Sequence, residues 1–160
     1  VLSILKTLEH AEKPSPGSVL GNAISGASRL LRSRSLVIVI SDFRAAGYEK
    51  PLGILARRHD VLAVRITSPI DFELPRAGYI PFRDPETGCS ASFPTSSTAF
   101  RICWEQEARE SVSRWETLCL RRGVSPLILS ATEDPVRAFS AFFSPGRESG
   151  SASILYGGRL

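Results

Sequence analysis

The chain has 160 residues, of which 42% are hydrophobic and 22% are charged, and its net charge is +4. This length suffices for one domain with a hydrophobic core, and the composition is that of an ordinary soluble globular chain. No apolar run approaches the roughly 20 residues of a membrane-spanning helix, and the first residues lack the basic region and cleavage site of a signal peptide. The chain does not begin with Met and contains none, so we expect a piece of a longer protein.

The N-terminal quarter of the chain predicts two helices and then a strand. Residues 1–11 have a helical pattern, and the breaker-rich stretch 12–18 (EKPSPGS) separates them from a second helical pattern over 19–31. Ser18 stands where the N-cap of the second helix belongs. Residues 35–41 form a nearly continuous apolar run, which is typical of a parallel strand buried on both faces.

The next segment predicts a helix, a strand and a hairpin. Residues 49–58 predict a helix with Pro51 in its first turn, where proline is tolerated. Residues 60–66 (DVLAVRI) predict a second apolar strand. The segments GYIPF and SASF flank RDPETGC, whose proline and glycine favour a turn, so we expect a small β-hairpin at the periphery.

A long amphipathic helix is predicted over 98–122, and Gly123 ends it. Trp104 lies near the edge of its apolar face, where core packing is favoured over a partner surface. The expected apolar face consists of Phe100, Cys103, Ala108, Val112, Trp115, Leu118 and Cys119.

The C-terminal part predicts a third apolar strand over 125–130 and a last helix, with Asp134 as N-cap and Pro135 at its first position. The Gly- and Ser-rich tail 144–160 is expected to be disordered, which leaves 1–143 as one domain. Strands that alternate with helices indicate a doubly wound α/β fold with a mainly parallel sheet. Three strands make a narrow sheet, so we expect its N-terminal strands to be missing.

The cysteines and histidines indicate no zinc or catalytic centre. The chain has three cysteines, an odd number without C-x-x-C spacing, which predicts neither a disulfide framework nor a zinc site. Cys103 and Cys119 are expected to be buried small hydrophobes, which fits a reducing cytoplasmic setting. A structural or capping role is favoured for His59, and no G-x-S-x-G, P-loop or G-x-G-x-x-G pattern occurs.

Asp42 is the main candidate for a functional residue. The apolar run 36–40 stops at Ser41 and Asp42, which places this carboxylate at the carboxyl end of a parallel strand, where such folds bind ligands. Alternatively, Asp42 is a loop residue or a cap, and Ser41 points into the sheet. The segment 132–134 (TED) follows the third strand and is expected at the same carboxyl edge of the sheet as Asp42. A capping role is favoured for it.

Several motifs in order carry a resemblance to a known family. They are SLVIVISDF, LARRHDVLAVRI, DPETG and the closing LSATEDPVRAF. With them, residues 1–143 resemble the C-terminal portion of the bacterial family called domain of unknown function 58. The resemblance implies a von Willebrand factor A-like domain, commonly associated with MoxR-type AAA+ ATPases.

Domains of this type bind a divalent cation, Mg²⁺ or Mn²⁺, at a metal-ion-dependent adhesion site. The resemblance implies Asp42 as one metal ligand and Ser18 as another, in place of the family's Thr. The D-x-S-x-S loop that supplies the remaining ligands does not occur in the chain, so these two residues make at most a weak site. Strand 36–41 would also lack its neighbour and form an exposed edge, open to self-association.

The resulting expectation is a non-enzymatic protein-interaction module that binds a partner such as a MoxR-type AAA+ ATPase. An alternative is a Mg²⁺-dependent phosphoryl-transfer or hydrolase domain that uses Asp42. Nucleic-acid binding through the arginines is disfavoured, because Asp and Glu are evenly mixed among them.

Overall fold

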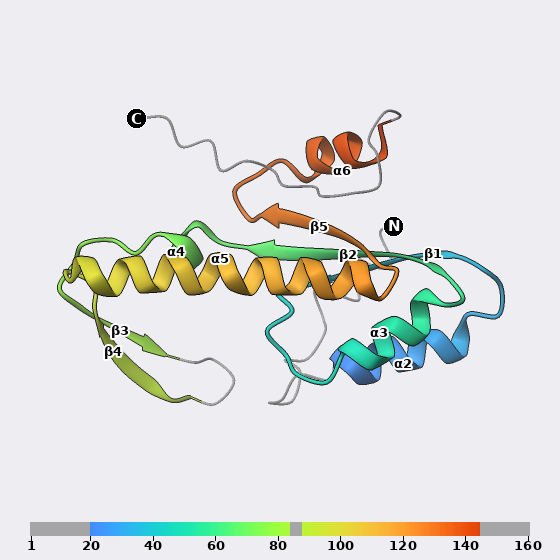
Figure 1. Ribbon diagram of the computed structural model, residues 1–160, viewed down its shortest axis with the longest axis horizontal. Coiled ribbons are helices and arrows are strands. Elements are labelled where there is room, and N and C mark those ends of the chain that lie inside the picture. Colours follow the sequence, from blue (N-terminus) through green and yellow to red (C-terminus); the bar gives the residue numbers. More distant parts are fainter. Residues whose placement is uncertain (1–19, 84–87, 145–160) are drawn as a thin grey trace, which may run out of the picture.

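The computed structural model describes residues 20–83 and 88–144 and has a mixed α/β fold. Its centre is a parallel sheet of β1 (Leu36–Ser41), β2 (Asp60–Thr67) and β5 (Ser125–Ser130), in the order β1-β2-β5 (Figure 1). A separate antiparallel hairpin consists of β3 (Tyr79–Arg83) and β4 (Ser90–Pro94). The three predicted parallel strands and the hairpin are therefore confirmed.

Helices lie on both faces of the parallel sheet. On one face are α2 (Leu20–Leu30), α3 (Glu49–Ala56) and the long α5 (Thr98–Arg121), whereas α6 (Pro135–Phe143) lies on the other (Figure 1). The sequence did not predict α4 (Pro69–Phe72), because four residues are too few to show helical periodicity. None of the helices in the described ranges is long and apolar enough to cross a membrane.

Some predictions fall on residues that the structure does not describe. They are the helix over 1–11, the N-cap Ser18, the turn residue Pro85 and the tail beyond Ser144. The domain boundary at 143 likewise remains a prediction.

The larger of two cores fills the space between the sheet and α2, α3 and α5. Leu52 and Leu55 of α3 have no exposed surface and pack toward the odd-numbered residues of β2. Its buried members are Ile24, Phe43, Tyr48, Leu52, Leu55, Val61, Ala63, Trp115, Cys119 and Val124.

The smaller core lies between the sheet and α6. It buries the opposite faces of β2 and β5 against Ala138 of α6, so that β2 is buried on both sides. Asp134 caps this helix as predicted, because its Oδ1 accepts a hydrogen bond from the backbone N–H of Val136 at 2.9 Å. The buried members of this core are Leu62, Val64, Leu127, Leu129 and Ala138.

The first strand is not covered in the same way. Ile38 and Ile40 stand beside the buried Leu62 and Val64 of β2, yet they are 42% and 61% exposed, and Leu36 is 56% exposed. The prediction that this strand is buried on both faces is wrong, because no described element covers the α6 side of β1. Among the described strands β1 pairs only with β2, so it is a sheet edge, as expected.

The long helix ends where the sequence indicated. Gly123 has a positive φ of 72°, and the N–H of Val124 donates to the carbonyl of Cys119 at 3.0 Å, which closes the last turn. Cys119 is fully buried, as predicted. Cys103, however, is exposed, because it lies on the N-terminal half of α5, which contributes no residue to either core.

The β-hairpin is attached to the N-terminal half of α5 by aromatic rings. Phe93 contacts Phe82 and Phe100 at centroid distances of 5.4 and 5.6 Å, and Trp104 lies 5.8 Å from Phe82. The Trp104 indole N–H donates to the carbonyl of Ile70 at 3.2 Å. Trp104 is therefore held by its ring and its polar atom, but it is only half-buried and belongs to neither core, so the predicted core packing is not confirmed.

Helix α2 approaches the loop after Asp42 so closely that only glycine fits at the contact. A Cβ added at Gly21 would lie 2.9 Å from the carbonyl oxygen of Gly47, whereas one added at Gly26 in the same helix would meet nothing within 4 Å.

We predict that Gly21→Ala destabilises the protein by about 1–3 kcal/mol through overpacking, and that Gly26→Ala stabilises it by about 0.5–1 kcal/mol. Urea unfolding of both variants tests this, and equal effects would contradict the close contact.

Burial also controls the chemistry of Cys119. It raises the pKa of this thiol from 9.0 to about 12, so the thiol stays neutral in the folded chain. The unfolded thiol ionises at a lower pH than the folded one. The stabilisation by neutral Cys119 is therefore present below pH 9 and is lost as the pH rises toward 12.

We predict that a thiol reagent at about pH 8 modifies Cys103 in the folded protein but Cys119 only after unfolding. Equal labelling rates of the two thiols would refute this.

Candidate functional site

Asp42 lies directly after β1, at the edge where the carboxyl ends of the parallel strands meet. Its side chain is exposed, and Oδ1 accepts a hydrogen bond from the backbone N–H of Arg44 at 3.2 Å. Ser41 Oγ accepts one from the N–H of Phe43 at 3.1 Å. Asp42 thus closes a tight turn while one carboxylate oxygen makes no hydrogen bond to any described residue.

The turn is strained at Phe43, whose φ of 53° is rare for a bulky residue. The ring is buried and held by two aromatic neighbours, with centroids 5.2 Å from Tyr48 and 5.1 Å from Trp115. Strain of this kind persists only where packing enforces it, and it is concentrated at functional sites. The aromatic packing therefore fixes the position from which Asp42 projects.

Beside Asp42 is an open hollow of about 300 Å³. Residues from the ends of β1 and β2, from α4 and from the middle of α5 line it. The charged residues among them are Asp42, Arg44, Arg65, Asp71 and Glu107.

Arg65 forms the inner wall of this hollow and is only 8% exposed. Its guanidinium donates to the carbonyl and to the hydroxyl of Ser111 on α5, at 3.1 and 3.0 Å, and lies 5.8 Å from the Trp115 ring centroid. Burial lowers the pKa of Arg65, while the negative charges of Asp42 and Asp71 act in the opposite direction. A buried cation therefore faces the carboxylates at the mouth of the sheet.

Asp71 is already engaged within the protein. It forms an ion pair with the Arg44 guanidinium, and its other oxygen accepts a hydrogen bond from the backbone N–H of Ser68 at 2.8 Å. Sequence reasoning missed Asp71, although Ser68-Pro69-Ile70-Asp71 is a local capping pattern. The residue reaches the site because β2 ends there and α4 follows at once.

The described residues fit a divalent cation only in part. Asp42 offers one exposed carboxylate, but Asp71 is paired and two guanidinium groups stand nearby. Within 20–83 and 88–144, no cluster of three or more His, Cys, Asp or Glu has the arrangement of a metal site. Ser18, the second expected ligand, lies outside the described residues. A complete coordination sphere therefore needs further oxygen ligands.

The other sequence candidates lie apart from Asp42. His59 is 4% exposed and precedes β2, at the opposite end of the strands, which agrees with a structural role. Thr132 follows β5, and its hydroxyl lies 3.0 Å from the hydroxyl of Ser130. Because β2 separates β5 from β1, Thr132 is at the same edge as Asp42 but two strands away, and it does not line the hollow.

Comparison with known proteins places these residues in a family. The family described as Protein of unknown function DUF58 matches residues 1–114. Uncharacterized protein MAV169 of Mycobacterium avium is 40% identical over 75 residues, which are 46% of this chain and 44% of that protein. Uncharacterized protein Rv1480 of Mycobacterium tuberculosis is 37% identical over 82 residues, 49% of this chain and 26% of that protein.

The chain thus spans less than half the length of these curated relatives. No solved structure matches it significantly. Since the family match covers most of the sequence, including Asp42, both strands at the hollow and most of α5, the chain belongs to the DUF58 family.

Proposed function

We propose that this chain is a von Willebrand factor A-like protein-interaction module without enzymatic activity, which binds its partner at the mouth of the parallel sheet. The main observation in support of this proposal is the exposed carboxylate of Asp42, which a strained and tightly packed turn presents at the rim of an open hollow. A rigid turn lowers the entropic cost of binding. The position at the carboxyl ends of parallel strands is the usual ligand position in such sheets.

The proposed partner class is a MoxR-type AAA+ ATPase, which follows from the family resemblance. The exposed thiol of Cys103 suits a reducing compartment, so the proposal places the module in the cytoplasm. A divalent cation would be held by Asp42 together with Ser18, and a carboxylate of the partner would add a ligand from outside. The described residues contain one of these ligands, so the proposal rests on Asp42 and not on the cation.

A second candidate is a Mg²⁺-dependent phosphoryl-transfer or hydrolase activity that uses Asp42. It is favoured by the hollow itself, in which carboxylates and the guanidinium groups of Arg44 and Arg65 lie together, as phosphate chemistry requires. Against it, the other two carboxylates of the hollow are engaged within the protein, since Asp71 is tied to Arg44 and Ser68 and Glu107 is paired with Arg114. Phosphate release from a phosphomonoester, lost in Asp42→Ala, would favour this candidate over the binding module.

Thermal unfolding with and without Mg²⁺ or Mn²⁺ tests the role of Asp42. If the cation binds there, we expect the unfolding temperature to rise at cation concentrations well above the Kd. The expected rise is about 2–4 °C for each kcal/mol that cation binding adds to the free energy of unfolding. Asp42→Asn keeps the acceptor for the Arg44 N–H but removes the charge, and it should abolish the rise. Glu107→Gln, at the same rim, is the control and should preserve it. A rise that persists in Asp42→Asn would exclude Asp42 as the ligand.

The exposed edge of β1 supports a second part of the proposal, self-association with another copy of the chain. Antiparallel pairing centred on Ile38 would place Leu36 opposite Ile40 of the second copy, which joins their exposed side chains into one apolar surface. The residues of β1 include no charged side chain and no proline, which are the features that usually oppose such pairing at a sheet edge.

We predict that sedimentation velocity shows a concentration-dependent dimer and that Ile38→Lys weakens it at least about tenfold, since a buried lysine opposes pairing. Ile54→Lys on α3 is the matched control, because Ile54 is 45% exposed and Ile38 is 42% exposed. A monomer at every concentration, or equal effects of both lysines, would be evidence against this edge as the interface.

A further inference from the structure

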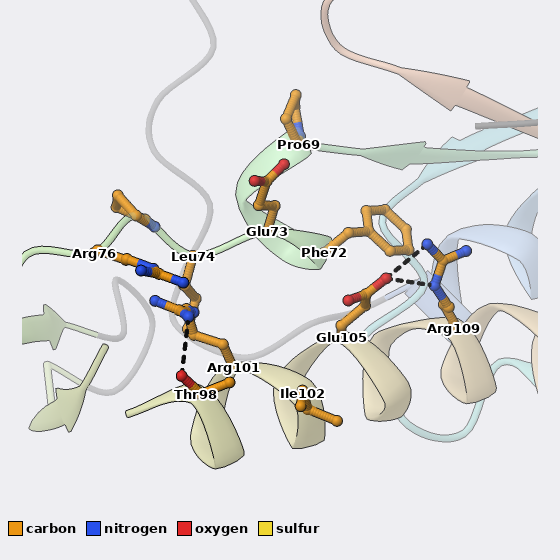
Figure 2. Close-up of a pocket in the computed structure, with 11 residues that line it drawn as sticks. Pro69, Phe72, Glu73, Leu74, Arg76, Thr98, Arg101, Ile102, Glu105 and Arg109 are labelled. Carbon is orange, nitrogen blue, oxygen red and sulfur yellow. Dashed lines mark hydrogen bonds and ion pairs between the residues drawn. The ribbon is translucent and has the colours of Figure 1, made fainter. Parts of the chain in front are cut away.

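A second and larger hollow lies beyond α4, between the segment that leads to β3 and the N-terminal half of α5 (Figure 2). Its volume is about 790 Å³. It shares the buried ring of Phe72 with the hollow at Asp42 but contains none of the charged residues of that site. It is referred to below as the arginine groove.

Two arginines from different parts of the chain meet at one end of this groove. Figure 2 shows the guanidinium groups of Arg76, from the segment before β3, and Arg101, from the first turns of α5, directed toward the same space. Arg101 donates to two neutral oxygens, the carbonyl of Thr95 at 3.3 Å and the hydroxyl of Thr98 at 3.5 Å. Two like charges thus lie at one end of a hollow that is open to solvent.

The carboxylates of the groove do not neutralise this pair. Glu105 is bound by Arg109, whose Nε and Nη2 donate to Oε1 at 3.0 and 2.8 Å. The carboxylate of Glu73 points toward Pro69, away from the two guanidinium groups (Figure 2). Among the described ion pairs, none joins Arg76 or Arg101 to an acid.

The backbone that carries the two arginines is firmly held. Thr95, which has no exposed surface, accepts a hydrogen bond from the N–H of Ala77 at 3.2 Å and donates its hydroxyl to the carbonyl of Gly78 at 2.9 Å. The N–H of Gly78 in turn donates to Ser96 Oγ at 3.0 Å. These bonds join the chain just after Arg76 to the chain just before α5, so the two walls of the groove are fixed relative to each other.

Apolar side chains form the rest of the lining. Phe72 and Leu74 are buried beneath the groove, while Ile102 on α5 is 49% exposed beside it. A purely ionic ligand would leave the exposed side chain of Ile102 uncovered. A peptide with carboxylates next to aliphatic side chains matches both parts of the lining.

We propose that the arginine groove binds an acidic, leucine-rich peptide segment of a protein partner, with a carboxylate between Arg76 and Arg101 and an aliphatic side chain against Ile102. A planar guanidinium group donates two parallel hydrogen bonds to the oxygens of a carboxylate. The ligand would also relieve the repulsion between the two cations. This site is separate from Asp42, and its test does not depend on the function proposed there.

Fluorescence anisotropy with a labelled probe peptide, Glu-Leu-Asp-Glu-Leu-Asp, tests the proposal on the chain as it stands. We expect saturable binding, absent for the uncharged peptide Gln-Leu-Asn-Gln-Leu-Asn. The double variant Arg76→Gln/Arg101→Gln should weaken binding at least about tenfold, because each charge-assisted contact contributes more than a neutral one. The double variant Arg57→Gln/Arg58→Gln removes the same charge from exposed positions at the end of α3 and should leave binding unchanged.

Several results would overturn the proposal. Equal weakening by both double variants would show that only the net charge attracts the peptide. No saturable binding below about 1 mM would exclude the groove as a peptide site. If inorganic phosphate or a short single-stranded DNA competed with the peptide and depended on Arg76 and Arg101 to the same extent, the groove would be a phosphate site. Circular dichroism of each variant confirms that it is folded.

Discussion

The burial of β2 on both faces is the constraint on which the rest of this structure depends. Its side chains point alternately into the two cores, and Leu62, Ala63 and Val64 have almost no exposed surface. Because β1 and β5 both pair with it in parallel, their carboxyl ends meet at the same edge. A strand buried on both sides and paired along both edges leaves the chain little freedom in how the remaining elements are placed.

The same strand determines the character of the Asp42 site. Arg65 belongs to β2 and is held under α5 by Ser111 and the Trp115 ring. That ring also supports Phe43, whose strained backbone positions Asp42. The carboxylate of Asp42 is thus coupled to the core through an aromatic ring and a buried cation. This coupling fixes the backbone position from which the exposed side chain projects.

The hollow at Asp42 and the arginine groove share the α4–α5 contact but differ in charge. Around Asp42, the carboxylates outnumber the guanidinium groups, and Asp71 is already paired with Arg44. In the arginine groove, Glu105 is paired with Arg109, while Arg76 and Arg101 face solvent together. The first arrangement suits a ligand that brings its own cation or hydrogen-bond donors, and the second suits an anion.

The sequence by itself determined the local elements, because each depends on neighbouring residues. The apolar runs predicted β1, β2 and β5, Asp134 and Pro135 predicted the start of α6, and Gly123 predicted the end of α5. These signals lie in hydrophobic alternation, caps and the left-handed conformation of glycine, which act within a few residues. The placement of Asp42 at a strand end followed from the same reasoning.

Only the tertiary structure decided which faces are covered and which charges meet. The exposure of Ile38 and Ile40 depends on how far α6 reaches across the sheet, which no local pattern encodes. Cys103 fits the helical period of α5 yet lies outside both described cores. Arg76 and Arg101 stand 25 positions apart in the sequence, counted from their numbers, and they converge because a buried threonine joins their two backbone segments. Contacts between distant residues are determined by packing of the whole chain, and a single sequence does not contain that information in local form.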